Sequence, residues 1–161
     1  MNKVENVTPV DAGVPDGYAT EPLVLRGRKV VGGFSQGEAM VTTDHISGWG
    51  GVDPRAGVII ETRHELRGQS FAGKVLLFPG AKGSSGWSNT FHLTRVIGTA
   101  PAAMLFVEMT TKVALGAVVT RAPAVTEFDQ DPFLVIQTGD WVQVDGDQAI
   151  VSVFKRRQHA R

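Results

Sequence analysis

Two apolar runs separated by one helical segment constrain the fold of this chain most strongly. The runs are KVLLFPG at Lys74–Gly80 and AAMLFVE at Ala102–Glu108. A short, continuous apolar run bounded by Gly or Pro is typical of a strand that is buried on both faces. Between the runs, Trp87 and Phe91 begin a pattern with helical spacing that stops at Gly98. The order strand, helix, strand predicts two parallel strands joined by a crossover helix.

Short strand candidates account for most of the remaining chain. They are LVLRGRKVVGG from Leu23, EAMVTT at 38–43, VIIET at 58–62 and three short strands within PFLVIQTGDWVQVDGDQAIVSVF. MTTKVALG predicts a short second helix that Gly116 ends, and AVVTRAP predicts a strand after it. The Asp-Gly pair of VDGDQ predicts a hairpin turn between the last two strands. The expected fold class is mixed α/β, with a β-rich barrel or sandwich around a central sheet.

The two ends of the chain differ in composition from its middle. Residues 1–22 are rich in Gly, Pro, Asp and Thr, and they predict a loosely ordered leader. The alternative is an arm that lies on a partner chain. The basic tail KRRQHAR at 155–161 predicts a frayed terminus. The 161-residue length suits one domain, expected at 23–154.

The overall composition excludes several classes of function. Lys and Arg total 16, as do Asp and Glu, so no excess charge points to nucleic acid or to an anionic membrane. No apolar run approaches the roughly 20 residues of a membrane-spanning helix. Cysteine is absent, so this chain has no disulfide, no thiol nucleophile and no cysteine-ligated metal. These features are compatible with a reducing cytoplasm, and we expect a cytoplasmic protein.

The loop GAKGSSG at 80–86, between the first apolar run and the predicted helix, is the strongest candidate site. The first N–H groups of a helix have no internal partner, and the helix dipole favours negative charge there. Lys82 adds a mobile cation, and the glycines allow a ligand to approach the backbone closely. The loop matches neither the nucleotide P-loop nor the hydrolase nucleophile elbow. A helix capped by Ser84, Ser85 or Ser88, without any chemistry, is the alternative.

Other residue types that often mark sites give weaker signals. The four histidines His45, His64, His92 and His159 include no pair with the spacing of a metal site, so no metal ligand is predicted. Trp49, Trp87 and Trp141 are expected to anchor the core or an interface.

Three segments together carry a resemblance to a known family. They are GGFSQGEAMVT, ISGWGGVDPRAGVIIETRHELRGQSFAGKVLLFPGAKGSS and GTAPAAMLFVE. In this order they resemble the small subunit of aconitase X, the swivelling domain of the aconitase superfamily. The resemblance covers about Leu23 to Phe154. It implies a β-rich, swivelling β/β/α domain that closes over a large aconitase X subunit, which is the expected partner.

The resemblance also implies an activity and a place for the cofactor. Family members are hydro-lyases that remove water from a small hydroxy acid, so we expect this chain to be active only with its large partner. An iron-sulfur cluster, where one is present, belongs to the large subunit. Because this chain has no cysteine, it supplies no thiolate to such a cluster and is expected to bind none alone.

The family's proposed proton acceptor is the first serine after the glycine in the loop, which is Ser84 here. A serine alkoxide at a helix start is stabilised by N–H groups that point at it and by nearby cations. The candidate substrate-binding residues are Lys82, Gly83, Ser85, Gly50 and Gly51.

Two features of these candidates leave alternatives open. The glycine pair of GWGGVDPRAG is either a place of close main-chain approach or a tight turn fixed by Asp53 and Pro54. In aconitase proper an arginine that clamps a substrate carboxylate follows the serine pair, whereas Gly86 and Trp87 follow here. A clamp is then expected from helix N–H groups, from Lys82 or from the partner.

Three functions remain as readings of the sequence. The main one is dehydration of cis-3-hydroxy-L-proline to Δ1-pyrroline-2-carboxylate with Ser84 as the base, which the long leader favours. The second is dehydration of mevalonate 5-phosphate by the same residue. The third is a non-catalytic swivelling or carrier module. A phosphohistidine carrier needs a histidine on the glycine-rich loop, and the serines found there count against this function.

Overall fold

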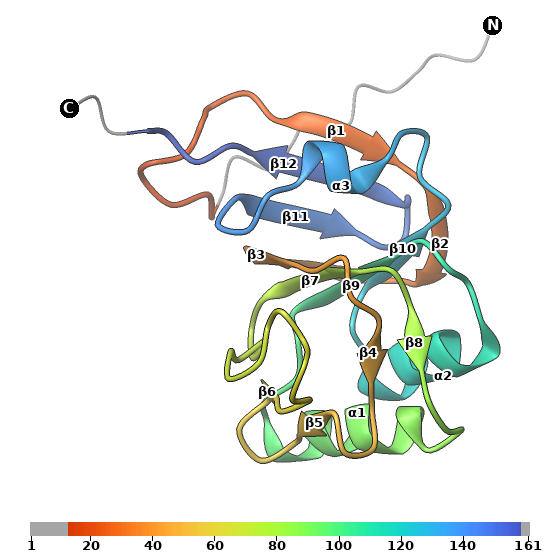
Figure 1. Ribbon diagram of the computed structural model, residues 1–161. Coiled ribbons are helices and arrows are strands. Elements are labelled where there is room, and N and C mark those ends of the chain that lie inside the picture. The colour runs from red at the N-terminus through yellow and green to blue at the C-terminus, as the bar shows by residue number, and fades with distance from the viewer. Residues whose placement is uncertain (1–12, 159–161) are drawn as a thin grey trace, which may run out of the picture.

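A computed structural model describes residues 13–158, and Figure 1 shows them as three layers. The upper layer holds β1, β11, β12 and α3, the middle layer holds β7, β9 and their neighbours, and α1 and α2 lie below. This layering confirms the expected mixed α/β, β/β/α class. The elements are β1 (Leu23–Arg26), β2 (Arg28–Val31), β3 (Phe34–Val41), β4 (Ile46–Ser47), β5 (Val52–Asp53), β6 (Val58–Ile59), β7 (Val75–Phe78), β8 (Ala81–Lys82), α1 (Trp87–Ile97), β9 (Ala103–Phe106), α2 (Thr111–Thr120), β10 (Ala124–Thr126), α3 (Pro132–Val135), β11 (Trp141–Asp145) and β12 (Ile150–Phe154).

The main sheet has eight strands in the order β1-β12-β11-β3-β7-β9-β10-β2. Its two edge strands, β1 and β2, are consecutive in the chain and are separated only by Gly27. The sheet must therefore curl until its edges approach each other, as a partly closed barrel does. A Cβ at Gly27 would lie 2.6 Å from the carbonyl oxygen of Thr126, so glycine is needed where the chain passes from one edge to the other.

The parallel pair predicted from the two apolar runs is confirmed. β7 pairs with β9 in parallel, from Val75 opposite Ala103 to Phe78 opposite Phe106, and α1 makes the crossover. Every residue of both strands is buried. Leu76 and its equivalents on one face pack against the helices, while Leu77 and its equivalents on the other face pack against β11 and β12. Burial on both faces explains why these runs are continuously apolar.

Several elements differ from the expectation. LVLRGRKVVGG, expected as one strand, forms the two edge strands β1 and β2. Gly116 does not end α2, which continues to Thr120 with Arg121 as a left-handed C-cap. The predicted strand AVVTRAP is therefore mostly helix. The first part of PFLVIQTGD is the short helix α3, begun by Asp131, whose side chain accepts a hydrogen bond from the N–H of Phe133 at 3.0 Å. The hairpin between β11 and β12 is confirmed, with 146–149 as its loop.

The ends of the described chain lie against each other. The N–H of Ala19 donates to the carbonyl of Lys155, and the N–H of Arg157 donates to the carbonyl of Gly17, both at 2.8 Å. Residues 1–12 and 159–161, including His159, lie outside the described residues. The division into a leader, a domain and a tail stays a prediction.

Candidate functional site

The serine loop, residues 80–86, leaves the sheet at the carboxyl end of β7. Its first part forms β8, which pairs in parallel with β4, placing Ser47 opposite Lys82. Gly83 has φ +91°, and a Cβ there would come within 3.2 Å of the Ser47 hydroxyl oxygen. Glycine therefore suits this position for its backbone conformation and its tight surroundings. Ser84 and Ser85 follow directly and are exposed.

Ser84 does not cap α1, contrary to one expectation. The N-cap is Gly86, which has no side chain to cap the first N–H groups of the helix. Instead, the Ser84 hydroxyl oxygen accepts a hydrogen bond from the N–H of Gly86 at 3.3 Å, and its carbonyl accepts one from the N–H of Trp87 at 3.2 Å. A backbone N–H that points at a hydroxyl oxygen favours negative charge on that oxygen.

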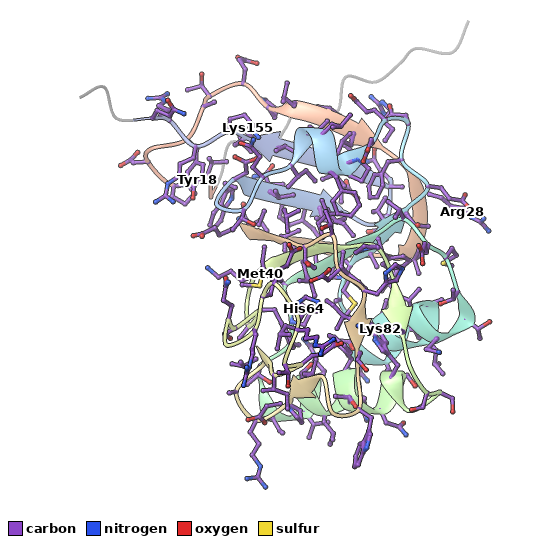
Figure 2. The ribbon with its side chains drawn as sticks, in the orientation of Figure 1. Tyr18, Arg28, Met40, His64, Lys82 and Lys155 are labelled. Carbon is purple, nitrogen blue, oxygen red and sulfur yellow. The ribbon has the colours of Figure 1, made fainter. Side chains whose placement is uncertain are left out.

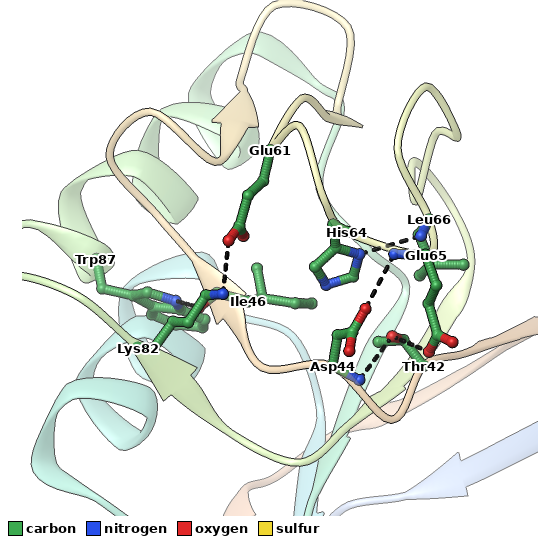
Figure 3. Close-up of polar contacts among 9 residues, drawn as sticks. All are labelled: Thr42, Asp44, Ile46, Glu61, His64, Glu65, Leu66, Lys82 and Trp87. Carbon is green, nitrogen blue, oxygen red and sulfur yellow. Dashed lines mark hydrogen bonds and ion pairs between the residues drawn. The ribbon is translucent and has the colours of Figure 1, made fainter.

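Trp87 anchors the far end of the serine loop. Its indole is fully buried, and its Nε1–H donates to the carbonyl of Ile46 at 2.8 Å, as Figure 3 shows. Its ring stacks on Phe91 with the centroids 4.2 Å apart. Of the two residues that follow the serine pair, Gly86 has no side chain and Trp87 is part of the core, so neither offers a side chain that could clamp a substrate carboxylate. Trp141 is half-buried, and Trp49 is 83% exposed.

Lys82 is held by a partner, although the sequence suggested a mobile cation. Its ammonium lies 2.5 Å from Oε1 of Glu61, which follows β6 (Figure 3). The positive charge is therefore compensated where it stands. The sequence could not pair these residues, because 21 positions separate them and a loop brings them together.

A second lysine reaches the serine loop from another element. The ammonium of Lys112, in the first turn of α2, donates a hydrogen bond to the carbonyl oxygen of Gly83. Sequence reasoning missed this residue. The signal that could have found it is topological, because loops that follow neighbouring parallel strands emerge at the same edge of a sheet.

The segment that carries Glu61 is fixed by a polar cluster at the end of β3. Oε1 of Glu65 accepts hydrogen bonds from the hydroxyl of Thr42 at 2.5 Å and from the N–H of Thr43 at 2.6 Å. The N–H of Glu65 donates to Oδ2 of Asp44 at 2.9 Å (Figure 3). The hydrogen bond from Thr42 lowers the pKa of Glu65 most, and partial burial opposes this shift.

His64 lies in the same segment and is buried, and Figure 2 shows it among the side chains of the lower half of the molecule. Nδ1 accepts the N–H of Leu66 at 3.1 Å, so a neutral ring carries its proton on Nε2. Nε2 of His64 and Oε2 of Glu61 are buried and have no hydrogen-bond partner within residues 13–158.

The glycine pair Gly50 and Gly51 forms a turn between β4 and β5. A Cβ at Gly51 would lie 2.3 Å from the carbonyl oxygen of Ser47, and the N–H of Gly51 donates to the carbonyl of Gly48 at 3.2 Å. Gly50 has φ +74° and is exposed. These contacts account for both glycines as turn residues, and a role in substrate binding stays a prediction for them, as it does for Lys82, Gly83 and Ser85.

One further pair of ionisable residues lies at this edge of the sheet. His45 lies 2.7 Å from Glu108 between Nε2 and Oε2, and both follow strands whose carboxyl ends meet at this edge. Across residues 13–158, no group of three or more His, Asp or Glu side chains could hold a metal ion, and the sequence has no cysteine. The residues of this chain therefore do not fit an iron-sulfur cluster. In the same described part, no helix is long and apolar enough to cross a membrane.

The curled sheet, the two helices beneath it and the serine loop at the carboxyl end of β7 define the class as a swivelling domain. Residues 24–153 match the aconitase X swivel domain family. The chain belongs to that family.

Relatives and solved structures agree with this assignment. A phosphomevalonate dehydratase small subunit of Methanosarcina acetivorans is 37% identical over 134 residues, which are 83% of this chain and 93% of that protein. The protein of the same name from Thermococcus gammatolerans is 40% identical over 132 residues, covering 82% and 98%. The crystal structure of Thermococcus kodakaraensis aconitase X in its holo-form has a TM-score of 0.77 at 38% identity, covering 83% of this chain and 99% of that chain.

Proposed function

We propose that this chain is the small subunit of a dehydratase that removes water from mevalonate 5-phosphate, with Ser84 as the base. Family membership supports a subunit of an aconitase X-type dehydratase, and a small subunit implies a large partner. The substrate rests on the relatives, whose shared name is phosphomevalonate dehydratase small subunit.

The preference for cis-3-hydroxy-L-proline is not supported by any of these relatives. It rested on the long leader, which precedes the matched residues and whose length carries no information about the chemistry of a substrate. The carrier alternative has no support either. The serine loop carries hydroxyls, and His92 lies on the exposed surface of α1.

The observation that carries the role of Ser84 is the hydrogen bond its hydroxyl oxygen accepts from Gly86. Within residues 13–158 this is the only hydrogen bond of the Ser84 side chain, so its own proton remains free to leave. In the reaction, the Ser84 hydroxyl first gives its proton to solvent, and the alkoxide that remains takes a proton from the carbon beside the carboxylate. The hydroxyl departs from the next carbon and takes up a proton supplied by solvent or by the large subunit. The products are a carbon–carbon double bond, water and the neutral serine.

The large subunit supplies what this chain lacks. An iron-sulfur cluster, if the holoenzyme holds one, is bound there, because the side chains of this chain do not fit one. The departing hydroxyl and most of the substrate are then held by groups across the interface. The part of this chain is to present Ser84 from a loop whose far end is fixed by the buried Trp87.

The test is to co-express the chain with its large subunit and to assay mevalonate 5-phosphate and cis-3-hydroxy-L-proline side by side. We expect turnover of the first and a loss of at least about a hundredfold in kcat for Ser84→Ala, the scale for removal of a general base. Ser35→Ala is the matched control, because Ser35 lies at the start of β3, the end away from the serine loop. Turnover of only the hydroxyproline would overturn the substrate, and a fast Ser84→Ala enzyme would overturn the base.

A further inference from the structure

We propose that Lys112 is a positioning residue that fixes the serine loop for catalysis by holding the Gly83 carbonyl. This inference rests on the proposed role of Ser84 and extends it to a residue on a different element. The contact joins the first turn of α2 to the residue directly before Ser84.

The position of Lys112 is set by backbone contacts and not by its flexible side chain alone. The N–H groups of Val107 and Glu108, just after β9, donate to the carbonyl of Pro79 at 3.2 and 2.8 Å. The start of α2 is then fixed by Thr110, whose side chain accepts a hydrogen bond from the N–H of Val113 at 3.4 Å. The junction between β9 and α2 is therefore tied to the start of the serine loop before Lys112 makes its own contact.

The serine loop needs such a tether at its middle. Trp87 anchors the end that enters α1, and β8 anchors the beginning. Gly83 lies between these anchors in a left-handed conformation and is exposed. Glycine loses more conformational freedom on ordering than other residues, so a hydrogen bond to its carbonyl has a large effect on how well Ser84 is placed.

The charges around the serine loop point to the same residue. The ammonium of Lys82 faces the Glu61 carboxylate at 2.5 Å, so its charge is compensated. Lys112 is bound to a neutral carbonyl and forms no ion pair within residues 13–158. Lys112 is half-buried, which restricts where its ammonium can go.

The test compares Lys112→Met and Lys112→Arg in the assembled two-subunit enzyme. Because Met keeps the apolar stem and removes the donor, we expect kcat to fall by about tenfold or more while KM stays within about twofold. Arg restores a charged donor, and its kcat is expected within about threefold of wild type. Lys29→Met is the matched control, because Lys29 forms an exposed ion pair with Asp147 at 3.6 Å on the edge strand β2.

Amide hydrogen exchange of residues 82–87 in the same complexes provides a readout that does not depend on the substrate or on the base. We expect faster exchange in Lys112→Met than in wild type, with Lys112→Arg close to wild type. An unchanged kcat, or a raised KM with unchanged kcat, would overturn the positioning role. A fast Ser84→Ala enzyme together with a slow Lys112→Met enzyme would show that the base proposal had failed and the tether had not.

Discussion

At the scale of the residue, Glu65 is the described group whose ionisation links most directly to the shape of the site. Its carboxylate accepts hydrogen bonds from Thr42 and Thr43, and these hold the segment from which Glu61 reaches Lys82. The pKa of Glu65 is lowered in the folded protein, chiefly by the Thr42 hydroxyl. A lowered pKa means that the folded state favours the ionised carboxylate, so protonation of Glu65 lowers the free energy of unfolding.

We predict that Thr42→Val lowers stability more at neutral pH than in acid. The buried Thr42 hydroxyl donates to Glu65 and accepts from the N–H of Asp44 at 3.0 Å, and only the first contact depends on the charge of Glu65. Loss of the first contact costs about 1 kcal/mol at pH 7, a value kept small by the exposure of Glu65. The contribution is present above the ordinary carboxyl pKa of 4.5 and is lost as pH falls through the lowered value. Urea unfolding from neutral to acidic pH measures it. The exposed Thr62→Val is the control, and a pH-independent difference would contradict the role of Glu65.

The sequence predicted which residues form the serine loop, but it did not predict the side chains that contact this loop. The exposure of Ser84 follows from glycines around an apolar strand end, which a sequence displays directly. Lys82 pairs with Glu61, and the Gly83 carbonyl accepts from Lys112, each more than 20 positions away in the sequence. The tertiary fold determines which groups a long side chain can reach, and the spacing of residues in the sequence does not show this.

At the scale of the element, the contact between α1 and α2 fixes the helix layer beneath the sheet. A Cβ at Gly116, in the middle of α2, would lie 2.1 Å from the ring of Trp87. The glycine therefore allows the helix to approach the indole. This explains why Gly116 does not mark the C-terminus of α2. The glycine is needed for helix packing, and α2 ends four residues later with Arg121 as its C-cap.

We predict that Gly116→Ala destabilises the protein although alanine is the better helix former. The added methyl group must displace the indole or separate the two helices, and such overpacking costs about 1–3 kcal/mol. Because the methyl carbon would lie 2.1 Å from the buried ring, we expect the upper part of this range, which exceeds the roughly 1 kcal/mol gained in helix propensity. Because Trp87 also anchors the serine loop, activity of the complex should fall as well. Urea unfolding and Trp fluorescence measure the first effect. Leu115→Ala, at an exposed neighbour in α2, is the control, and a stabilised Gly116→Ala protein would refute this packing.

The elements that sequence patterns predicted best are those whose environment is uniform. β7 and β9 are buried on both faces, so every position in their apolar runs requires an apolar residue. The half-exposed α2 has both buried and exposed positions, and the apolar sequence of its second half is also typical of a strand. The short α3 depends on one Asp cap and one Pro, which compete with an apolar run of the same length as a strand.

At the scale of the whole molecule, the fold explains why a separate chain can carry part of an active site. The sheet buries one hydrophobic cluster against the helices and another beneath β11 and β12. The domain is therefore held together by its own core. Ser84 lies at the edge of this body on an exposed loop. For the proposed role of Ser84 as the base, a second body must cover this loop to exclude water from the chemistry.

We predict that the isolated chain folds cooperatively but does not turn over mevalonate 5-phosphate, and that adding the separately purified large subunit restores activity. Its two cores supply the stability, while its sequence has no cysteine, residues 13–158 fit no metal cluster, and neither Gly86 nor the buried Trp87 could clamp a carboxylate with its side chain. Circular dichroism during heating tests cooperative folding, and the iron content after anaerobic reconstitution tests whether the chain binds a cluster. A turnover assay of each chain and of the mixture tests the activity. Adding the Ser84→Ala chain is the matched control, because it should assemble equally well without restoring the rate. A large subunit that reaches the full rate alone would remove the serine loop from the mechanism, whereas a small subunit that turns over alone would show that its loop is a complete active site.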